Sequence, residues 1–244
     1  MGIILNYLWR GWLILLGFVF ILLLGIPVLL LSIKEKHFPY AYIFIRLWCQ
    51  ILFYGMGFRY ELIKETKQRI DPKTNYIFIA NHTSIIDILL MCVLHPKHPI
   101  CFIGKAELAN IPIFSIFYKR ICILVDRKDP KSRADVYRKA AIKMQHGQNI
   151  VIFPEGGVSD DPNVILDDFK DGAFILSSKH KFPIAVYTFV GLREMFPFDS
   201  TKGHPGNVRV HLNTILSPDI SKDQLKSISH NEIKKTLDSY LRVK

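Results

Sequence analysis

An uncharged run near the amino terminus, residues 12–33, constrains this chain more than any other feature of its 244 residues. Its 22 positions contain no Asp, Glu, Lys or Arg. A helix rises about 1.5 Å per residue, so the run is about 33 Å long and matches a hydrocarbon core of about 30 Å. It is too long for the apolar part of a secretory signal, and no small-x-small cleavage site precedes Lys34. We therefore expect a retained, membrane-associated helix.

A second apolar stretch, residues 38–57, is rich in aromatic side chains but contains Arg46 and Gln50. One charge in the middle of the segment argues against a second full span. The pattern predicts an amphipathic helix in the membrane interface, and a buried helix of the globular part fits it equally well. We assign residues 1–57 to a membrane-anchoring helical pair and residues 58–244 to a globular domain.

The formal net charge of +11 suits nucleic acid, anionic lipid or an acidic substrate. A neighbouring membrane segment favours anionic lipid, and the sequence has no zinc-finger spacing or RNP-like strand that would indicate nucleic acid. Cys49, Cys92, Cys101 and Cys122 lie far apart within apolar strings. They predict buried thiols in a reducing compartment rather than disulfides or metal ligands, which places the globular domain on the cytoplasmic side.

From residue 58 onward, short strands alternate with helices. Ser132 is the expected cap of one helix, and Ser229 with Glu232 forms a possible capping box for the last. This alternation predicts an α/β fold with a mostly parallel central sheet flanked by helices. The expected strands are residues 59–63, 76–80, 100–103, 122–125, 149–153, 184–190 and 208–215, and the expected helices are 84–93, 132–146, 169–180 and 229–241.

The string Asn-His-Thr-Ser-Ile-Ile-Asp, residues 81–87, follows a predicted strand. Within one regular helix, His82 and Asp87 would point about 140° apart. They can meet if His82 lies in the turn before the helix and Asp87 within it, which the cap-forming residues Asn81 and Ser84 support. Asp87 would then accept a hydrogen bond from Nδ1–H of His82, leaving Nε2 as a general base. For an isolated His/Asp pair, a capping histidine and a surface carboxylate are the commoner outcome.

Further polar blocks adjoin other predicted strands: Gly-Lys-Ala-Glu-Leu at 104–108, Val-Asp-Arg at 125–127, Phe-Pro-Glu-Gly at 153–156 and Phe-Pro-Ile at 182–184. Open α/β sheets bind ligands at the carboxyl ends of their strands, so we expect these blocks to converge at one sheet edge. They would combine a base, carboxylates and the cations Lys105 and Arg127, which suits an anionic substrate with a hydroxyl group. Taken singly, each cation is more typical of a solvated surface.

In order and spacing, these blocks resemble the glycerolipid acyltransferase family over residues 60–214. NHTSIID matches the family's Asn-His-x-x-x-x-Asp, KAEL its Lys-x-Glu-Leu, VDR the arginine of its second block, and FPEG its third block. The resemblance implies that His82 is the catalytic base and Asp87 its orienting partner. It also implies that Lys105 and Arg127 hold the phosphate of the acceptor.

The same resemblance implies that Glu155 and Gly156 shape the acceptor site, within an acyltransferase domain at residues 58–244. The implied reaction moves a fatty acyl group from a thioester donor, acyl-CoA or acyl carrier protein, to a lysophospholipid. The foremost acceptor is 1-acyl-glycerol-3-phosphate, which would yield phosphatidate. No Ser or Cys stands at a nucleophile elbow, so direct transfer without an acyl-enzyme is expected. We expect no bound cofactor or metal, and a location at the cytoplasmic membrane or an endomembrane.

Three departures from the family pattern concern the acceptor. Gly157-Val158-Ser159 replaces the usual Thr-Arg-Ser, the glycine before the second block is absent, and Tyr187 occupies the region of the fourth block's second proline. Arg120 is a candidate for the charge lost at Val158. An acceptor without a phosphomonoester, such as lyso-ornithine lipid or a headgroup-bearing lysophospholipid, is therefore an alternative. A non-catalytic lipid-binding protein is the alternative class, and the intact blocks argue against it.

Overall fold

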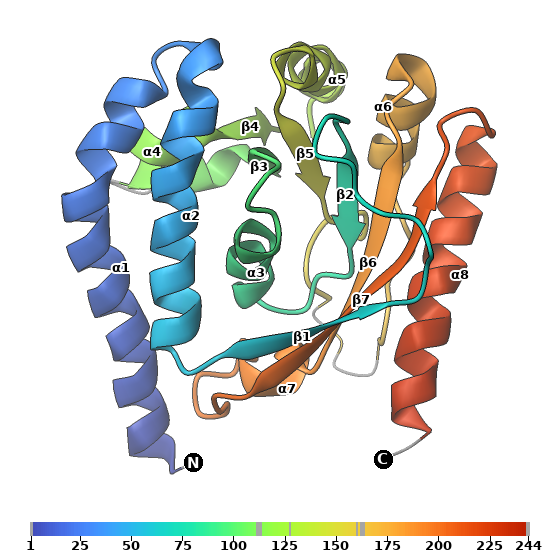
Figure 1. Ribbon diagram of the computed structural model, residues 1–244. Coiled ribbons are helices and arrows are strands. Elements are labelled where there is room, and N and C mark those ends of the chain that lie inside the picture. The colour runs from blue at the N-terminus through green and yellow to red at the C-terminus, as the bar shows by residue number, and fades with distance from the viewer. Residues whose placement is uncertain (1, 111–113, 127, 160, 162–163, 243–244) are drawn as a thin grey trace.

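The computed structural model describes residues 2–110, 114–126, 128–159, 161 and 164–242. Its amino-terminal part is a pair of helices, α1 (Ile3–Leu31) and α2 (Phe38–Gly55), joined by the short 3-10 helix η1 (Glu35–His37). Figure 1 shows the two helices side by side along one flank of the molecule. The predicted helical pair is thus confirmed. Within the described residues, α1 is the one helix that is long and apolar enough to cross a membrane.

A seven-stranded sheet forms the centre of the molecule, in the order β1-β7-β6-β2-β5-β3-β4. The five strands from β6 to β4 run parallel, β7 runs antiparallel to β6, and β1 runs parallel to β7. The mostly parallel sheet is therefore confirmed. The strands are β1 (Arg59–Lys64), β2 (Ile77–Ala80), β3 (Ile100–Lys105), β4 (Cys122–Val125), β5 (Asn149–Ile152), β6 (Ile184–Val190) and β7 (Asn207–Leu216).

Helices cover both faces of the sheet, so every residue of β2 is buried, as expected for an interior parallel strand. Helices α2 and α3 share one apolar cluster with one face, and α5, α6 and α8 share another with the opposite face. The remaining elements are α3 (Ile86–Leu94), η2 (Ala106–Asn110), α4 (Phe114–Ile121), α5 (Pro130–Gln145), α6 (Gly172–His180), α7 (Leu192–Met195) and α8 (Lys222–Leu241). Helices α4 and α7 were not among the sequence predictions.

Helix α2 belongs to the core on one face and is exposed on the other. Phe38 and Phe53 are fully buried in the cluster that contains α3 and β2. The Tyr42 hydroxyl donates to the carbonyls of Cys92 and His95, at 3.2 and 3.0 Å, and Arg46 donates to that of Val93 at 3.2 Å. These carbonyls lie at the carboxyl end of α3, where intrahelical donors run out. The exposed face carries large apolar side chains, at Tyr40, Ile43 and Leu47.

Three predicted helix starts are wrong. Helix α6 begins at Gly172 rather than at residue 169, and α5 and α8 begin earlier than expected because stronger caps lie upstream. Helix α5 begins at Pro130, and Asp129 caps it by accepting from the backbone N–H groups of Lys131 and Ser132. Proline at the first helical position favours this start. Helix α8 begins at Lys222 with a capping box of Ser221 and Gln224, so Ser229 lies buried inside the helix. The fold is otherwise positioned as the alternating pattern predicts.

All four cysteines are free and buried, as predicted. Burial raises the pKa of the Cys101 thiol to about 12. Because the thiolate is the reactive form, this thiol is a poor nucleophile. The cysteines therefore act as small apolar side chains of the core.

Candidate active site

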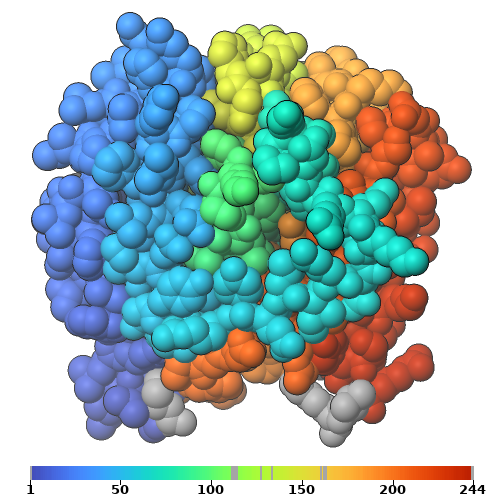
Figure 2. All heavy atoms as spheres, viewed as in Figure 1, coloured from blue at the N-terminus to red at the C-terminus, as the bar shows by residue number. Residues whose placement is uncertain are grey.

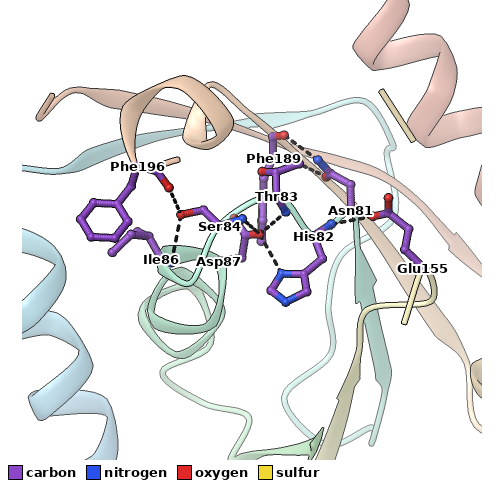
Figure 3. A network of polar contacts seen from close by, with 9 residues as sticks. All are labelled: Asn81, His82, Thr83, Ser84, Ile86, Asp87, Glu155, Phe189 and Phe196. Atoms are coloured by element: carbon purple, nitrogen blue, oxygen red, sulfur yellow. Dashed lines mark hydrogen bonds and ion pairs between the residues drawn. The ribbon is translucent and has the colours of Figure 1, made fainter. Parts of the chain in front are cut away.

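His82 and Asp87 contact each other where β2 passes into α3. His82 lies in the connection after β2, and Asp87 is the second residue of α3. Nδ1 of His82 is 3.0 Å from Oδ2 of Asp87 (Figure 3). The predicted arrangement, with histidine in the turn and aspartate in the helix, is the one observed. The alternative, a capping histidine with a solvated aspartate, is excluded because Asp87 is fully buried.

The Asp87 carboxylate is fixed by the backbone that precedes its own helix. Oδ2 accepts hydrogen bonds from the N–H groups of Thr83 at 2.6 Å and Ser84 at 2.9 Å, in addition to His82. Oδ2 already accepts from two backbone N–H groups, so it acts as an acceptor toward His82 as well. Nδ1 of His82 therefore carries the proton, and Nε2 presents a lone pair.

The imidazole of His82 is also held by stacking. Its ring lies on that of Phe153, with centroids 4.2 Å apart and planes inclined by 15°. The Phe153 ring is in turn stacked with that of Phe102, with centroids 6.5 Å apart. The His82 side chain keeps 17% of its surface exposed. The ring is therefore fixed in orientation while remaining accessible, as a general base requires.

Glu155 joins the dyad to the third sequence block. Its Oε1 accepts from the backbone N–H of His82 at 2.7 Å (Figure 3). Its Oε2 accepts from the N–H of Asp167 at 3.0 Å. Burial raises the pKa of Glu155 to about 7, against the opposing effect of these two hydrogen bonds and of the nearby His82. Glu155 thus organises the backbone around the base rather than presenting a free carboxylate.

Two further side chains, in contacts not anticipated from the sequence, hold this connection against β6 and against the end of α7. The Asn81 amide donates to the carbonyl of Phe189 at 2.9 Å and accepts from its N–H at 2.7 Å. The Ser84 hydroxyl donates to the carbonyl of Phe196 at 2.8 Å. Asn81 and Ser84 were expected as helix caps. The Ser84 hydroxyl does accept from the N–H of Ile86 at 3.3 Å, at the start of α3. Both side chains also bind backbone more than 100 residues away in the chain, a separation that local patterns do not reveal.

Register brings the predicted blocks of β2, β3 and β5 to the same level. Ile79 pairs with Ile152 on β5, so His82 falls opposite Glu155 when the pairing is continued. Phe102 pairs with Val151, which by the same continuation places Lys105 level with Pro154. Lys105 is exposed at the end of β3, and its carbonyl accepts from the Tyr118 hydroxyl at 3.2 Å. The predicted convergence of these three blocks is correct.

Gly156 lies in the turn directly after Glu155, with a positive φ of 83° that side-chain-bearing residues rarely adopt. Its N–H donates to the carbonyl of Phe153 at 3.0 Å. A Cβ at this position would lie 2.5 Å from Nζ of Lys170. The positive φ therefore favours glycine, and a Cβ would in addition displace the flexible end of the Lys170 side chain. Arg127, the second predicted cation, lies outside the described residues.

Two other sequence expectations fail for topological reasons. The block at 182–184 opens β6, which runs parallel to β2, so Pro183 lies beside the start of β2, at the opposite edge from His82. Arg120 lies at the end of α4, just before β4 begins, and thus also at the opposite edge from Lys105. Its guanidinium donates to the carbonyl of Leu29 at 3.2 Å. Arg120 does not replace the charge lost at Val158.

The fold and this strand-end site define a class of protein that sequence comparison also identifies. Residues 61–190 match the family described as Acyltransferase. The match covers more than half of the chain, and the protein belongs to the acyltransferase family.

Relatives include a 1-acyl-sn-glycerol-3-phosphate acyltransferase of Helicobacter pylori, 28% identical over 146 residues, which are 59% of this chain and 61% of that protein. The chloroplastic enzyme BAT2 of Brassica napus, given the same activity, is 26% identical over 193 residues, covering 78% of this chain and 54% of that protein. The chain therefore matches less than two thirds of the length of either relative.

The fold is also that of a solved structure. The crystal structure of the 1-acyl-sn-glycerophosphate (LPA) acyltransferase PlsC from Thermotoga maritima superimposes with a TM-score of 0.78. The alignment covers 98% of each chain, and the sequences are 23% identical. The similarity thus extends over the amino-terminal helical pair as well as the sheet.

Proposed function

We propose that this protein is a 1-acyl-glycerol-3-phosphate O-acyltransferase that forms phosphatidate in phospholipid biosynthesis. One observation carries the proposal: a partly exposed imidazole, oriented by a buried carboxylate, lies where three strands end. Relatives named for this activity and membership of the acyltransferase family support it.

His82 is the proposed general base. Its Nε2 takes the proton of the acceptor hydroxyl while the hydroxyl oxygen attacks the carbonyl carbon of the acyl thioester. Asp87 stabilises the imidazolium that forms and keeps the reactive tautomer. The tetrahedral intermediate then collapses, the carbon–sulfur bond breaks, and the imidazolium returns the proton to the thiolate. The acyl group passes directly to the acceptor, and the base is regenerated.

The developing oxyanion needs a hydrogen-bond donor close to the attacked carbonyl. The turn after Glu155 is the candidate. Gly156 is excluded, because its N–H already donates within the turn. Gly157 is the remaining backbone donor of this pair, and a Cβ there would meet open space, so the approach to it is not obstructed.

Lys105 is the proposed phosphate ligand at the end of β3, level with the third block. Its side chain is exposed, and its ammonium forms no ion pair with a described residue. Arg127 keeps the role that the family resemblance gives it, and Glu155 and Gly156 shape the site by fixing the backbone beside His82. The donor is acyl-CoA or acyl carrier protein.

Residues 1–57 are the proposed membrane anchor, with α1 lying along the bilayer surface. Large apolar side chains of α1 are exposed along its whole length, among them Ile4, Ile14, Leu23 and Leu30. Both ends of the helix contact the globular domain. Arg10 donates to the carbonyls of residues 197, 199 and 202, and Leu29 accepts from Arg120. Figure 2 shows the segment after α7, in orange, at the same lower edge as the start of α1.

Because both ends of α1 lie on one domain, they belong on one side of the bilayer, which the reduced cysteines suggest is the cytoplasmic side. The helix pair would then bury its apolar face among the lipids. Carbonate extraction should leave the protein in the membrane pellet, and release into the supernatant would show a peripheral association.

A second candidate keeps the chemistry and changes the acceptor. Val158 stands where the family has arginine, and valine supplies no hydrogen-bond donor for a phosphate. An acceptor without a phosphomonoester, such as lyso-ornithine lipid or a headgroup-bearing lysophospholipid, would not need that arginine.

The deciding experiment offers purified protein in detergent micelles a labelled acyl donor and a panel of lysolipids. The expected result is the highest catalytic efficiency with lysophosphatidate. His82→Ala serves as the inactive control, with its fold checked by circular dichroism. Higher efficiency on an acceptor without the phosphomonoester would establish the second candidate, and no transfer to any lysolipid would point to lipid binding alone.

A further inference from the structure

Lys170 occupies an unusual place in the site, although no block of the sequence singles it out. Its side chain lies across Gly156, and Nζ, Cδ and Cε would be 2.5, 2.9 and 3.1 Å from a Cβ built there. The ammonium group therefore lies over the turn of the third block, next to Glu155. Two residues further along that block stands Val158, where a cation is missing.

The backbone around Lys170 is fixed to the same block. Lys170 donates its N–H to the carbonyl of Pro154 at 2.8 Å, and Asp167 donates its N–H to Oε2 of Glu155 at 3.0 Å. Residues 167–170 thus form a second layer over the turn. Continued register places Lys105 level with Pro154, so both lysines start from the same height at the sheet edge.

Among the described residues, the Lys170 ammonium has no acidic partner. Its side chain is exposed, and its ammonium forms no ion pair or hydrogen bond with any residue that the structure describes. Nearby lysines differ in this respect, because Lys222 and Lys226 both bind Asp171 at 3.1 and 2.8 Å. A positioned ammonium over the turn that follows Glu155 is suited to a negatively charged ligand.

We propose that Lys170 is a phosphate-binding, specificity-determining residue that takes the place of the arginine absent at position 158. The inference rests on the proposed function, since it assigns the acceptor's phosphomonoester to the space between Lys105 and Lys170. The glycine at position 156 then has a second purpose, because it lets the lysine chain cross the turn and deliver its charge.

The test measures steady-state kinetics of the full chain with two acceptors of the same acyl chain, lysophosphatidate and monoacylglycerol. Lys170→Met keeps the methylenes that cross Gly156 and removes the charge. The preference for lysophosphatidate over monoacylglycerol should fall about tenfold or more, since one charge-assisted hydrogen bond accounts for roughly 10- to 150-fold in affinity. The change should appear in KM for lysophosphatidate, and the inhibition constant of glycerol 3-phosphate should rise with it.

Two further variants make the result specific. Lys179→Met, at the far end of α6, removes an exposed lysine that touches none of the blocks and should leave the preference unaltered. Val158→Arg added to Lys170→Met should restore much of the preference, because the arginine returns a cation to the third block. An unchanged preference in folded Lys170→Met would overturn the inference and leave the proposed function intact. A wild-type protein that acylates other lysolipids and not lysophosphatidate would overturn both.

Discussion

At the residue scale, the two oxygens of the buried Asp87 carboxylate differ in their hydrogen bonding. Oδ2 accepts from two backbone N–H groups and from His82, whereas Oδ1 is buried and accepts from none of the described residues. An asparagine side chain can place its carbonyl at Oδ2 and its amide at Oδ1. The geometry around His82 would therefore persist while the negative charge is lost.

Asp87→Asn should fold and retain membrane binding but lose activity by about 10³–10⁴-fold, if its orienting charge acts like that of a triad aspartate. The loss should fall on kcat, because the charge stabilises the imidazolium that forms during transfer. The measurement is kcat and KM for both substrates, beside a thermal melt of each protein. Turnover within tenfold of wild type in a folded variant would show that Asp87 orients without electrostatic help.

Asn81 has a structural consequence of its own. Its side chain pairs with both backbone groups of Phe189, and removing it leaves a buried N–H and a buried carbonyl without partners. Asn81→Ala should lower the free energy of unfolding by about 2–6 kcal/mol, since each of the two unsatisfied groups costs roughly 1–3 kcal/mol. Denaturant unfolding in detergent measures this. A change below about 0.5 kcal/mol would show that water replaces the amide.

At the element scale, the turn of residues 153–156 follows β5 and contacts both His82 and Lys170. Gly156→Ala imposes a positive φ on alanine, at about 1–2 kcal/mol, and places Cβ against the Lys170 side chain. The variant should lose activity more than stability, because Lys170 can move away at little cost while its charge is misplaced. Rates and melting temperature, measured together, test this. Equal kinetics with a lowered melting temperature would contradict a positioning role.

The same turn predicts a pH dependence of stability. Glu155 has a pKa of about 7 in the folded protein, raised by burial from an ordinary value of 4.5. Between these values the folded state holds a proton that the unfolded state has released. Stability from this group should therefore fall as pH rises from about 4.5 to 7, by up to about 1.4 kcal/mol per unit, and then level off.

Denaturant unfolding at pH 5 and 7.5 measures the effect, with Glu155→Gln as the comparison, since glutamine does not titrate. Wild type should lose more stability than Glu155→Gln over that interval. Equal losses would show that Glu155 is ionised throughout, held by the N–H groups of His82 and Asp167.

Among the elements, the sequence predicted what depends on local pattern. β4 and β6 have the expected limits, and the turn between His82 and Asp87 follows from their spacing. Contacts between residues far apart in the chain could not be predicted from the sequence. The pairing of Asn81 with Phe189 depends on strand order, and the edge at which Pro183 lies depends on strand direction. Lys170 lies over Gly156 because two loops fold together, and neither loop encodes that contact alone.

At the scale of the whole molecule, the amino-terminal pair is both surface and core. From the sequence alone, a domain lacking residues 1–57 would be expected to be more soluble but poor on lipid substrates. In the structure, Phe53, Leu52 and Phe38 of α2 are at most 3% exposed and pack in the main apolar cluster. Removing residues 1–57 should therefore give an unfolded or aggregated product. Recovery of soluble, cooperatively melting protein would contradict this.

Two single substitutions separate the contributions of α2. Phe53→Asp buries a charge and should abolish folding, whereas Ile43→Asp, at a side chain 61% exposed, should leave the melting temperature within a few degrees. Because Ile43 lies on the proposed lipid face, the second variant should instead bind anionic vesicles more weakly. Vesicle sedimentation measures this, and undiminished binding would remove Ile43 from the membrane-facing surface.

The hydrogen bonds from Tyr42 and Arg46 to the carboxyl end of α3 have a consequence for modularity. Helix α3 is nine residues long and carries Asp87 near its amino end. An unrelated hydrophobic tail in place of residues 1–57 could restore attachment to a bilayer, yet it would leave the last carbonyls of α3 without donors. The amino-terminal pair is therefore not an interchangeable membrane-targeting segment. It supports the helix that carries Asp87, one of the two residues of the dyad.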